Sequence, residues 1–142
     1  MKEKPHNKTY PCHCLNVRRT GQMITDMYNK NLAPSGLTVS QFSILSQLGC
    51  SESVSVSEIA AALSLERTTL VRNLKILEKK GLICDNASKG RSRQITLSEK
   101  GASCYDTARP FWENAQSNLE DAIGVESLAL LANTLARLSE FE

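Results

Sequence analysis

Hydroxyl and cationic side chains recur on one side of a predicted helix between residues 64 and 82. At 3.6 residues per turn, Leu70, Leu74 and Leu77 share one stripe, which predicts a buried side. The opposite side carries Thr68, Arg72, Lys75 and Lys79, with Thr69 on its flank. Such groups suit phosphate oxygens and base edges, although an ordinary solvated face is the alternative for this helix alone.

A second group of cations follows Gly81, where the pattern changes to that of short strands. "LICDN" and "RQITL" each suit a strand, with Leu82 and Cys84 predicted on one side of the first, and Ile95 and Leu97 on one side of the second. The polar segment between them predicts a β-hairpin. The cations in or beside its tip are Lys89, Arg91 and Arg93. Arginines at such a tip can enter a minor groove, where negative potential attracts them.

The elements that must position these cations are mostly helices. A helix is predicted from about Leu15 to Leu32, where "APSG" ends it. Thr38 is the predicted N-cap of a second helix that closes at Gly49, and Ser57 the predicted N-cap of the short helix "SEIAAALSL". A short helix, a tight turn and an amphipathic second helix form a helix-turn-helix. The hairpin that follows makes it a winged helix-turn-helix.

Amphipathic helices also flank this unit. Ser98 is expected to cap a helix from about Glu99, with Pro110 expected to kink it or divide it, and Gly124 to end it. The last leucines have three-four-three spacing, which is typical of an interhelical seam, and they are Leu128, Leu131, Leu135 and Leu138. We predict that the terminal helices join two copies, which would present two recognition helices to a two-fold related DNA site.

These elements predict one mainly α domain over residues 1–142. Its parts are a mobile start over residues 1–14, a winged-helix DNA-binding core over 38–97, and N- and C-terminal dimerisation helices over 15–35 and 98–142.

Composition and charge limit the class of protein. The chain has 142 residues, 41% of them hydrophobic and 23% charged, with a net charge of +2. It carries eight Lys or Arg against three Asp or Glu from Glu66 to Arg93, but three against eight from Gln94 to Glu142. One basic segment in a chain of modest charge favours contact with a polyanion. With no membrane-length apolar run and no secretory h-region, the expected compartment is the cytoplasm, with no membrane partner.

Three segments carry a resemblance to a known family. They are "LAPSGLTVSQFSIL", "VSEIAAALSLERTTLVRNLKILEKKGLI" and "GRSRQITLSEKG". In their order and spacing the chain resembles the MarR family of winged-helix transcriptional regulators, from about Leu15 to Phe141. The resemblance implies an obligate homodimer, a recognition helix in the major groove and Arg91 in the minor groove. Lys89 replaces the aspartate that usually pairs with this arginine, so the usual ordering ion pair of the wing is absent.

The resemblance also implies effectors. In this family, small aromatic acids and other lipophilic compounds bind between the dimer helices and the winged domain. The redox alternative rests on Cys12, His13 and Cys14, which precede the first predicted helix, because a helix start favours thiolate, the reactive form. In the OhrR-like peroxide-sensing branch, the reactive cysteine lies 23 residues before the leucine of an "LT" motif, as Cys14 lies before Leu37.

A tyrosine fourteen residues after the cysteine supports it in that branch, and Tyr28 matches, whereas Val39 stands where a second tyrosine is expected. Two alternatives remain open for this cluster. Cys14 could be a small apolar residue, and Cys12, His13, Cys14 and His6 could bind a metal, although C-x-C lacks the usual C-x-x-C spacing. Cys50, Cys84 and Cys104 are predicted to be buried and without a role.

The sequence therefore predicts a homodimeric, sequence-specific DNA-binding regulator, favouring a repressor that a small molecule or an oxidant releases. The predicted partner is a pseudo-palindromic operator. The predicted DNA contacts are Arg67, Thr68, Thr69, Arg72, Lys75, Lys89, Arg91 and Arg93. An enzyme is not expected, since the chain has no phosphate loop, H-E-x-x-H or nucleophile elbow, and no cofactor is expected. A winged helix that binds only protein is the alternative function.

Overall fold

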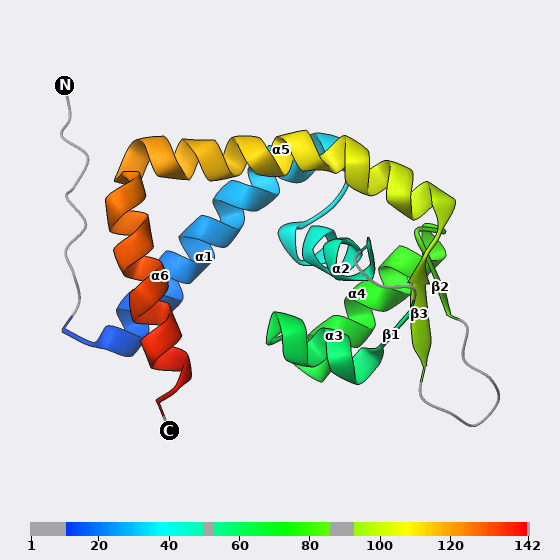
Figure 1. Ribbon diagram of the computed structural model, residues 1–142, viewed down its shortest axis with the longest axis horizontal. Helices are drawn as coiled ribbons and strands as arrows, with labels where there is room; N and C mark the ends of the chain where they lie inside the picture. The colour runs from blue at the N-terminus through cyan, green and yellow to red at the C-terminus, as the bar shows by residue number, and fades with distance from the viewer. Residues whose placement is uncertain (1–10, 50–52, 86–92, 142) are drawn as a thin grey trace.

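The computed structural model of the protein is mainly helical. The structure describes residues 11–49, 53–85 and 93–141. Figure 1 shows the first helix running diagonally beneath the long fifth helix, with the second, third and fourth helices grouped at the other end. In chain order the first part is α1 (His13–Leu32), the 3-10 turn η1 (Ala33–Ser35), α2 (Val39–Gly49), β1 (Val54–Ser55), α3 (Val56–Leu63) and α4 (Arg67–Lys79).

The second part of the chain adds the sheet and two further helices. Its elements are β2 (Ile83–Asp85), β3 (Gln94–Leu97), α5 (Glu99–Ile123) and α6 (Val125–Ser139). The three strands form one antiparallel sheet in the order β1-β3-β2, so β3 is central. The mainly helical fold is the predicted winged helix, with β2 and β3 after the helix-turn-helix of α3 and α4 and β1 before it.

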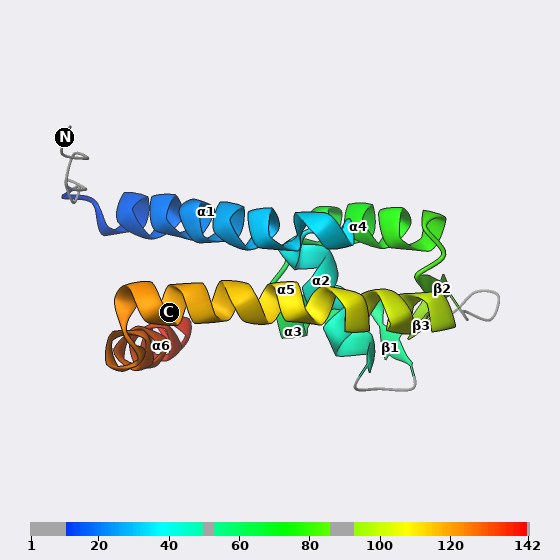
Figure 2. The ribbon, with the colours of Figure 1, turned by 90° about the horizontal axis from the view of Figure 1, so that it is seen from above.

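The core lies where α2, α4 and the sheet meet the first half of α5. Phe42 of α2 stacks on Tyr105 and Trp112 of α5, with ring centroids 5.0 and 5.6 Å apart. Figure 2 shows α1 and α4 in one layer and α5 with α6 in another. Among the described residues the largest fully buried side chains are Leu32, Ile44, Leu45, Leu48, Ile59, Leu70, Leu74, Leu77 and Ile95.

Two glycines allow the junction between α4, β2 and α5. Gly81 has φ +75°, and a Cβ on Gly101 would lie 2.0 Å from the Leu82 carbonyl oxygen.

The structure corrects two predicted helix starts. The first helix begins at His13 rather than near Leu15, which places Cys14 inside its first turn. The short helix is capped by Ser55 rather than Ser57, because Ser55 Oγ accepts from Glu58 N while Glu58 Oε2 accepts from Ser55 N, both at 3.1 Å. Only Ser55 has a glutamate three residues later, as a capping box requires.

The structure also corrects two predictions about the second half of the chain. Pro110 does not divide α5, which continues from Glu99 to Ile123 as a single helix. Packing outweighs the lost backbone donor there, since Ala108 and Ala115 of the same helix are fully buried. Cys84 of β2 is exposed, although Leu82, predicted on the same side, is buried, and Ile83 between them is buried as well. Leu82 lies before the strand, in the core, so the alternation of buried and exposed side chains does not continue through it. Cys104 is half-buried, and Cys50 lies outside the described residues.

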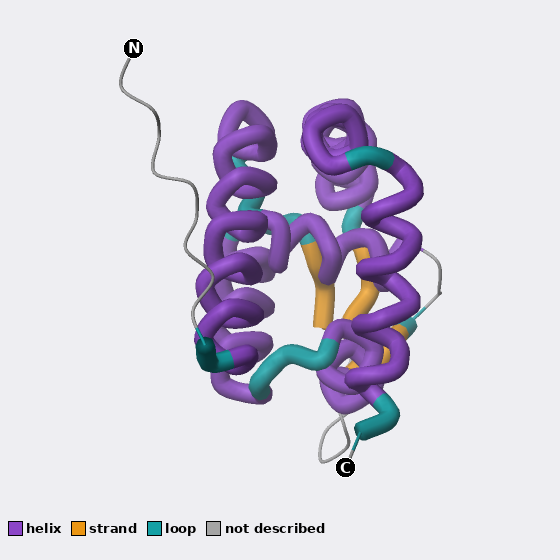
Figure 3. The backbone as a smooth tube through the Cα atoms, turned by 90° about the vertical axis from the view of Figure 1, so that its left-hand side faces the viewer, coloured by secondary structure: helices purple, strands orange, loops and turns teal. Residues whose placement is uncertain are grey.

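The predicted caps at the other helix ends are confirmed. Thr38 Oγ1 accepts from Gln41 N at 3.2 Å, and Ser98 Oγ accepts from Gly101 N at 2.9 Å. Gly124, with φ +93°, separates α5 from α6, and Figure 3 shows α6 turning away from α5 there. The predicted leucine seam therefore lies on a helix of its own.

Candidate nucleic-acid interface

The amphipathic helix α4 divides its residues as the sequence predicted. Leu70, Leu74 and Leu77 have no exposed surface. The side chains on the opposite side are exposed, and they are Thr68, Arg72, Lys75 and Lys79, with Arg67 exposed at the helix start. Thr69 on the flank is half-buried. The buried leucines thus hold a hydroxyl and cation face toward the outside.

The start of α4 leaves backbone donors available. Ser64 ends α3 in the left-handed region, with φ 50°, and this sharp turn sets the direction in which α4 leaves. The N-cap of α4 is Glu66, whose side chain makes no cap hydrogen bond. Free backbone N–H groups and the positive end of the helix dipole attract phosphate at such a start. The first turn carries Arg67, Thr68 and Thr69.

A polar contact joins α4 to the start of α2. Gln41 of α2 is buried, with 5% of its surface exposed. Its Oε1 accepts from Thr38 N at 3.1 Å, and its Nε2 donates to Asn73 Oδ1 of α4 at 3.4 Å. Asn73 Nδ2 in turn donates to the Thr69 carbonyl at 3.1 Å. Sequence reasoning gave neither Gln41 nor Asn73 a role, although T-x-x-Q is a capping-box signal.

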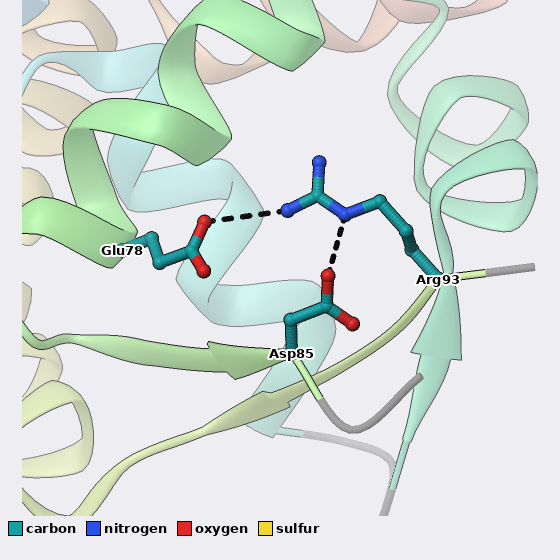
Figure 4. A network of polar contacts seen from close by, with 3 residues as sticks. All are labelled: Glu78, Asp85 and Arg93. Atoms are coloured by element: carbon teal, nitrogen blue, oxygen red, sulfur yellow. Dashed lines mark hydrogen bonds and ion pairs between the residues drawn. The ribbon is translucent and has the colours of Figure 1, made fainter. Parts of the chain in front are cut away.

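Arg93 lies in a network of ion pairs at the base of the predicted wing. Figure 4 shows its guanidinium between Glu78 of α4 and Asp85 of β2. Arg93 Nε is 2.6 Å from Asp85 Oδ2, and Nη2 is 3.3 Å from Glu78 Oε2. The sequence placed Arg93 among the DNA contacts and gave the two acids no role. The other two wing cations, Lys89 and Arg91, lie outside the described residues.

The redox candidates Cys14 and Tyr28 lie far apart on α1. Cys14 is exposed in the first turn, whereas Tyr28 is buried and its hydroxyl donates to Gln116 Oε1 of α5. Burial, with a smaller effect from the Glu120 carboxylate, raises the pKa of Tyr28 above its usual value. Fourteen residues of helix span about 21 Å, so Tyr28 cannot support Cys14 of its own chain. For this pairing, Tyr28 would have to come from a second copy of the chain.

The metal alternative gains no geometric support. Within residues 11–49, 53–85 and 93–141, no three His, Cys, Asp or Glu side chains lie close enough together to hold an ion. His6, one of the four ligands considered, is outside these ranges. The described part of the chain also contains no helix that is both long and apolar enough to cross a membrane.

Comparisons with known proteins agree with this geometry. A model of the MarR family matches residues 37–89, which include α4. The chain is 34% identical to the transcriptional regulator MosR of M. tuberculosis, covering 92% of this chain and 96% of MosR with a TM-score of 0.79. The chain belongs to the MarR family. This MarR-family protein is a DNA-binding transcriptional regulator and not an enzyme.

Two further structures are relevant because they contain DNA. MosR in complex with DNA is 33% identical over 91% of this chain and 96% of that chain, with a TM-score of 0.78. The transcriptional repressor CouR, bound to a 23-mer DNA duplex, is 25% identical over 90% and 92% of the two chains, with a TM-score of 0.80. The MarR-family protein therefore shares its fold with regulators solved on DNA.

Proposed function

We propose that the protein is a homodimer that binds a pseudo-palindromic operator and represses transcription until a signal releases it. The observation that carries the proposal is the outward face of α4. In the described part of the chain, the side chains of Thr68, Arg72 and Lys75 are exposed and make neither a hydrogen bond nor an ion pair. Three polar groups on the rigid face of a helix, held by fully buried leucines, are available for DNA.

The proposed DNA contacts fall into base contacts and phosphate contacts according to their position on α4 and the wing. Thr68, Thr69 and Arg72 are nearer the helix start, which enters the major groove, so we assign them to base edges. Arg67 and Lys75 are assigned to phosphates. Lys89 and Arg91 extend the contact to phosphate or to the neighbouring minor groove. Base contacts give sequence preference, whereas phosphate contacts give affinity that salt weakens.

The proposal of a dimer is supported by large apolar side chains that are exposed to solvent in a single chain. α1 and α6 lie at the same end of the molecule but in separate layers (Figures 1 and 2). Leu135 and Leu130 of α6 are 48% and 68% exposed. Other large exposed apolar residues of this end are Leu15, Val17, Met23, Ile123, Val125, Leu131, Leu138 and Phe141. We therefore assign residues 15–35 and 98–142 to dimerisation and 38–97 to DNA binding. Repression by occupying the operator is the simplest action of such a dimer.

We propose that the releasing signal is oxidation of Cys14 or a small aromatic or lipophilic molecule. Cys14 is exposed at the end of α1 that the dimer interface would include, so a larger, more polar oxidised sulfur there would disturb packing between copies. Tyr28 of a second copy is its proposed neighbour. Such a disturbance changes the separation of the two α4 helices and hence the fit to DNA.

Selection of genomic fragments by the purified protein, with and without an organic hydroperoxide, tests the proposal. We expect enrichment of a sequence with two-fold related halves, about one helical turn apart, and its loss on oxidation or with an effector. A salt titration on random duplex is the companion measurement, because DNA contacts make affinity fall steeply with salt. Absence of binding even at low salt would support a winged helix that binds only protein.

A further inference from the structure

We infer that Arg93 is a positioning residue that fixes the base of the wing to the recognition helix α4. The inference rests on the proposed function and adds to it a role for Arg93. Arg93 contacts two elements of the candidate interface. Glu78 lies in the last turn of α4, and Asp85 ends β2. Figure 4 shows both carboxylates pointing toward the one guanidinium.

The geometry uses the shape of the guanidinium. Asp85 binds Nε at 2.6 Å, and Glu78 binds Nη2 at 3.3 Å, so two nitrogens of one rigid plane hold two acids. A lysine ammonium has no such fixed fork. The three side chains are only partly exposed, at 37% for Arg93, 22% for Asp85 and 47% for Glu78. Partial burial reduces the screening of the ion pairs by water and salt.

The positions of Asp85 and Arg93 in the chain allow the network to position the wing. Asp85 immediately precedes residues 86–92, and Arg93 immediately follows them. The contact between Arg93 and Asp85 therefore joins the two ends of this segment, which contains Lys89 and Arg91. The contact with Glu78 ties those ends to α4. It thereby fixes the two residues that flank the segment, Asp85 and Arg93, relative to α4.

Charge supports a positioning role over a direct phosphate contact. Both carboxylates bind the guanidinium of Arg93, which makes it less available to a phosphate. Two carboxylates beside a DNA-binding helix weaken binding by repulsion. A role in holding Arg93, and through it the base of the wing, explains why Glu78 and Asp85 are present there.

The variant Glu78→Gln plus Asp85→Asn separates the two roles by the sign of its effect. It removes two negative charges and keeps the size of both side chains, so electrostatics alone predicts tighter binding to DNA. The positioning role predicts that affinity for the selected operator falls about threefold to tenfold, the size that one or two such ion pairs can supply. Affinity for random duplex should stay the same or rise.

Glu66→Gln is the matched control, because Glu66 is an exposed acid at the other end of α4 without a cap hydrogen bond. It should tighten binding to both duplexes. The thermal midpoint of each variant is measured alongside, and we expect it to fall by no more than about 5 °C, because ion pairs this close to the surface contribute little to overall stability. A loss of operator affinity that merely follows a lower midpoint would overturn the positioning role.

Arg93→Gln supplies the second measurement. In the positioning role, the operator affinity of Arg93→Gln falls together with that of the double variant, and the ratio of operator to random-duplex affinity falls in both. If Arg93 instead contacts phosphate, Arg93→Gln weakens both duplexes equally, the double variant tightens both, and the inference is wrong. Wild-type protein that fails to distinguish operator from random duplex would reject the proposed function itself, and the inference with it.

Discussion

Gln41 Nε2 of α2 lies 3.4 Å from Asn73 Oδ1 of the recognition helix α4. This contact links the N-terminal cap of one helix to the middle of the other, since Gln41 Oε1 also accepts from Thr38 N. A second side chain reaches the same helix start from α1, where Asn29 Oδ1 accepts from Val39 N at 2.8 Å. Buried amides of this kind fix the angle between helices, because each unpaired group would be costly.

Gln41→Leu should lower the free energy of unfolding by about 1–3 kcal/mol, because it leaves Thr38 N and Asn73 Oδ1 without their partner. Urea unfolding followed by circular dichroism measures this change. Gln47→Leu, a half-buried residue on the same helix, is the control and should change the free energy by no more than about 0.5 kcal/mol. Equal changes in the two variants would show that Gln41 has no special role.

Leu131→Asp plus Leu135→Asp should dissociate or unfold the proposed dimer. Burying a leucine side chain contributes about 1.5–3 kcal/mol, which a buried carboxylate reverses. Sedimentation velocity measures the assembly. Ala129→Asp plus Asn133→Asp adds two aspartates to the opposite side of α6 and should leave the dimer intact. A folded dimer in the leucine variant would place the interface elsewhere.

Treatment with stoichiometric organic hydroperoxide should release the wild-type protein from its operator, and Cys14→Ser should remain bound. The reason is that Cys14 is an exposed thiol in the first turn of α1. Fluorescence anisotropy on labelled operator measures release. Cys12→Ser tests a resolving role for the neighbouring thiol, and Cys84→Ser is a control for another exposed cysteine. Release that persists in Cys14→Ser would leave small-molecule binding as the switch.

Tyr28 should make stability depend on pH in alkali. Burial, and to a smaller degree Glu120, raise its pKa in the folded state. The folded protein therefore holds the phenolic proton more tightly than the unfolded chain does. This stabilisation is fully present below the unfolded value near 10 and is lost as pH rises through the folded pKa. Urea unfolding between pH 8 and about 11 measures it. Tyr28→Phe should lose part of this alkaline dependence, whereas Tyr105→Phe is the comparison on α5.

The sequence predicted the winged helix because its signals are local. Leucine spacing identified α4 and its outward face, and Gly81 and Gly124 marked the ends of helices. The missed features depend on tertiary contacts. Nothing in the spacing of Glu78, Asp85 and Arg93 indicates that folding brings them together. Pro110 was expected to kink or divide α5, but packing of the long helix keeps it continuous.

Cys84 shows the same limit on a smaller scale. Leu82 and Ile83 are both buried, whereas Cys84 is exposed, so burial does not alternate here as the sequence pattern predicted. In so short a strand, burial depends on which residues reach the core rather than on the two-residue period. Cys14 and Tyr28 have the number of intervening residues that the family resemblance requires. Both lie on the same helix, however, and its length keeps them apart within one chain.

Binding of Arg72→Ala and Lys75→Ala to operator and to random duplex tests base reading by α4 most directly. Arg72→Ala should cost about 1–3 kcal/mol on the operator and much less on random DNA, since it removes a base contact. Lys75→Ala should weaken both and lower the salt slope by about one, since it removes a phosphate contact. An equal loss on both duplexes for Arg72→Ala would contradict the proposal that α4 reads the operator sequence.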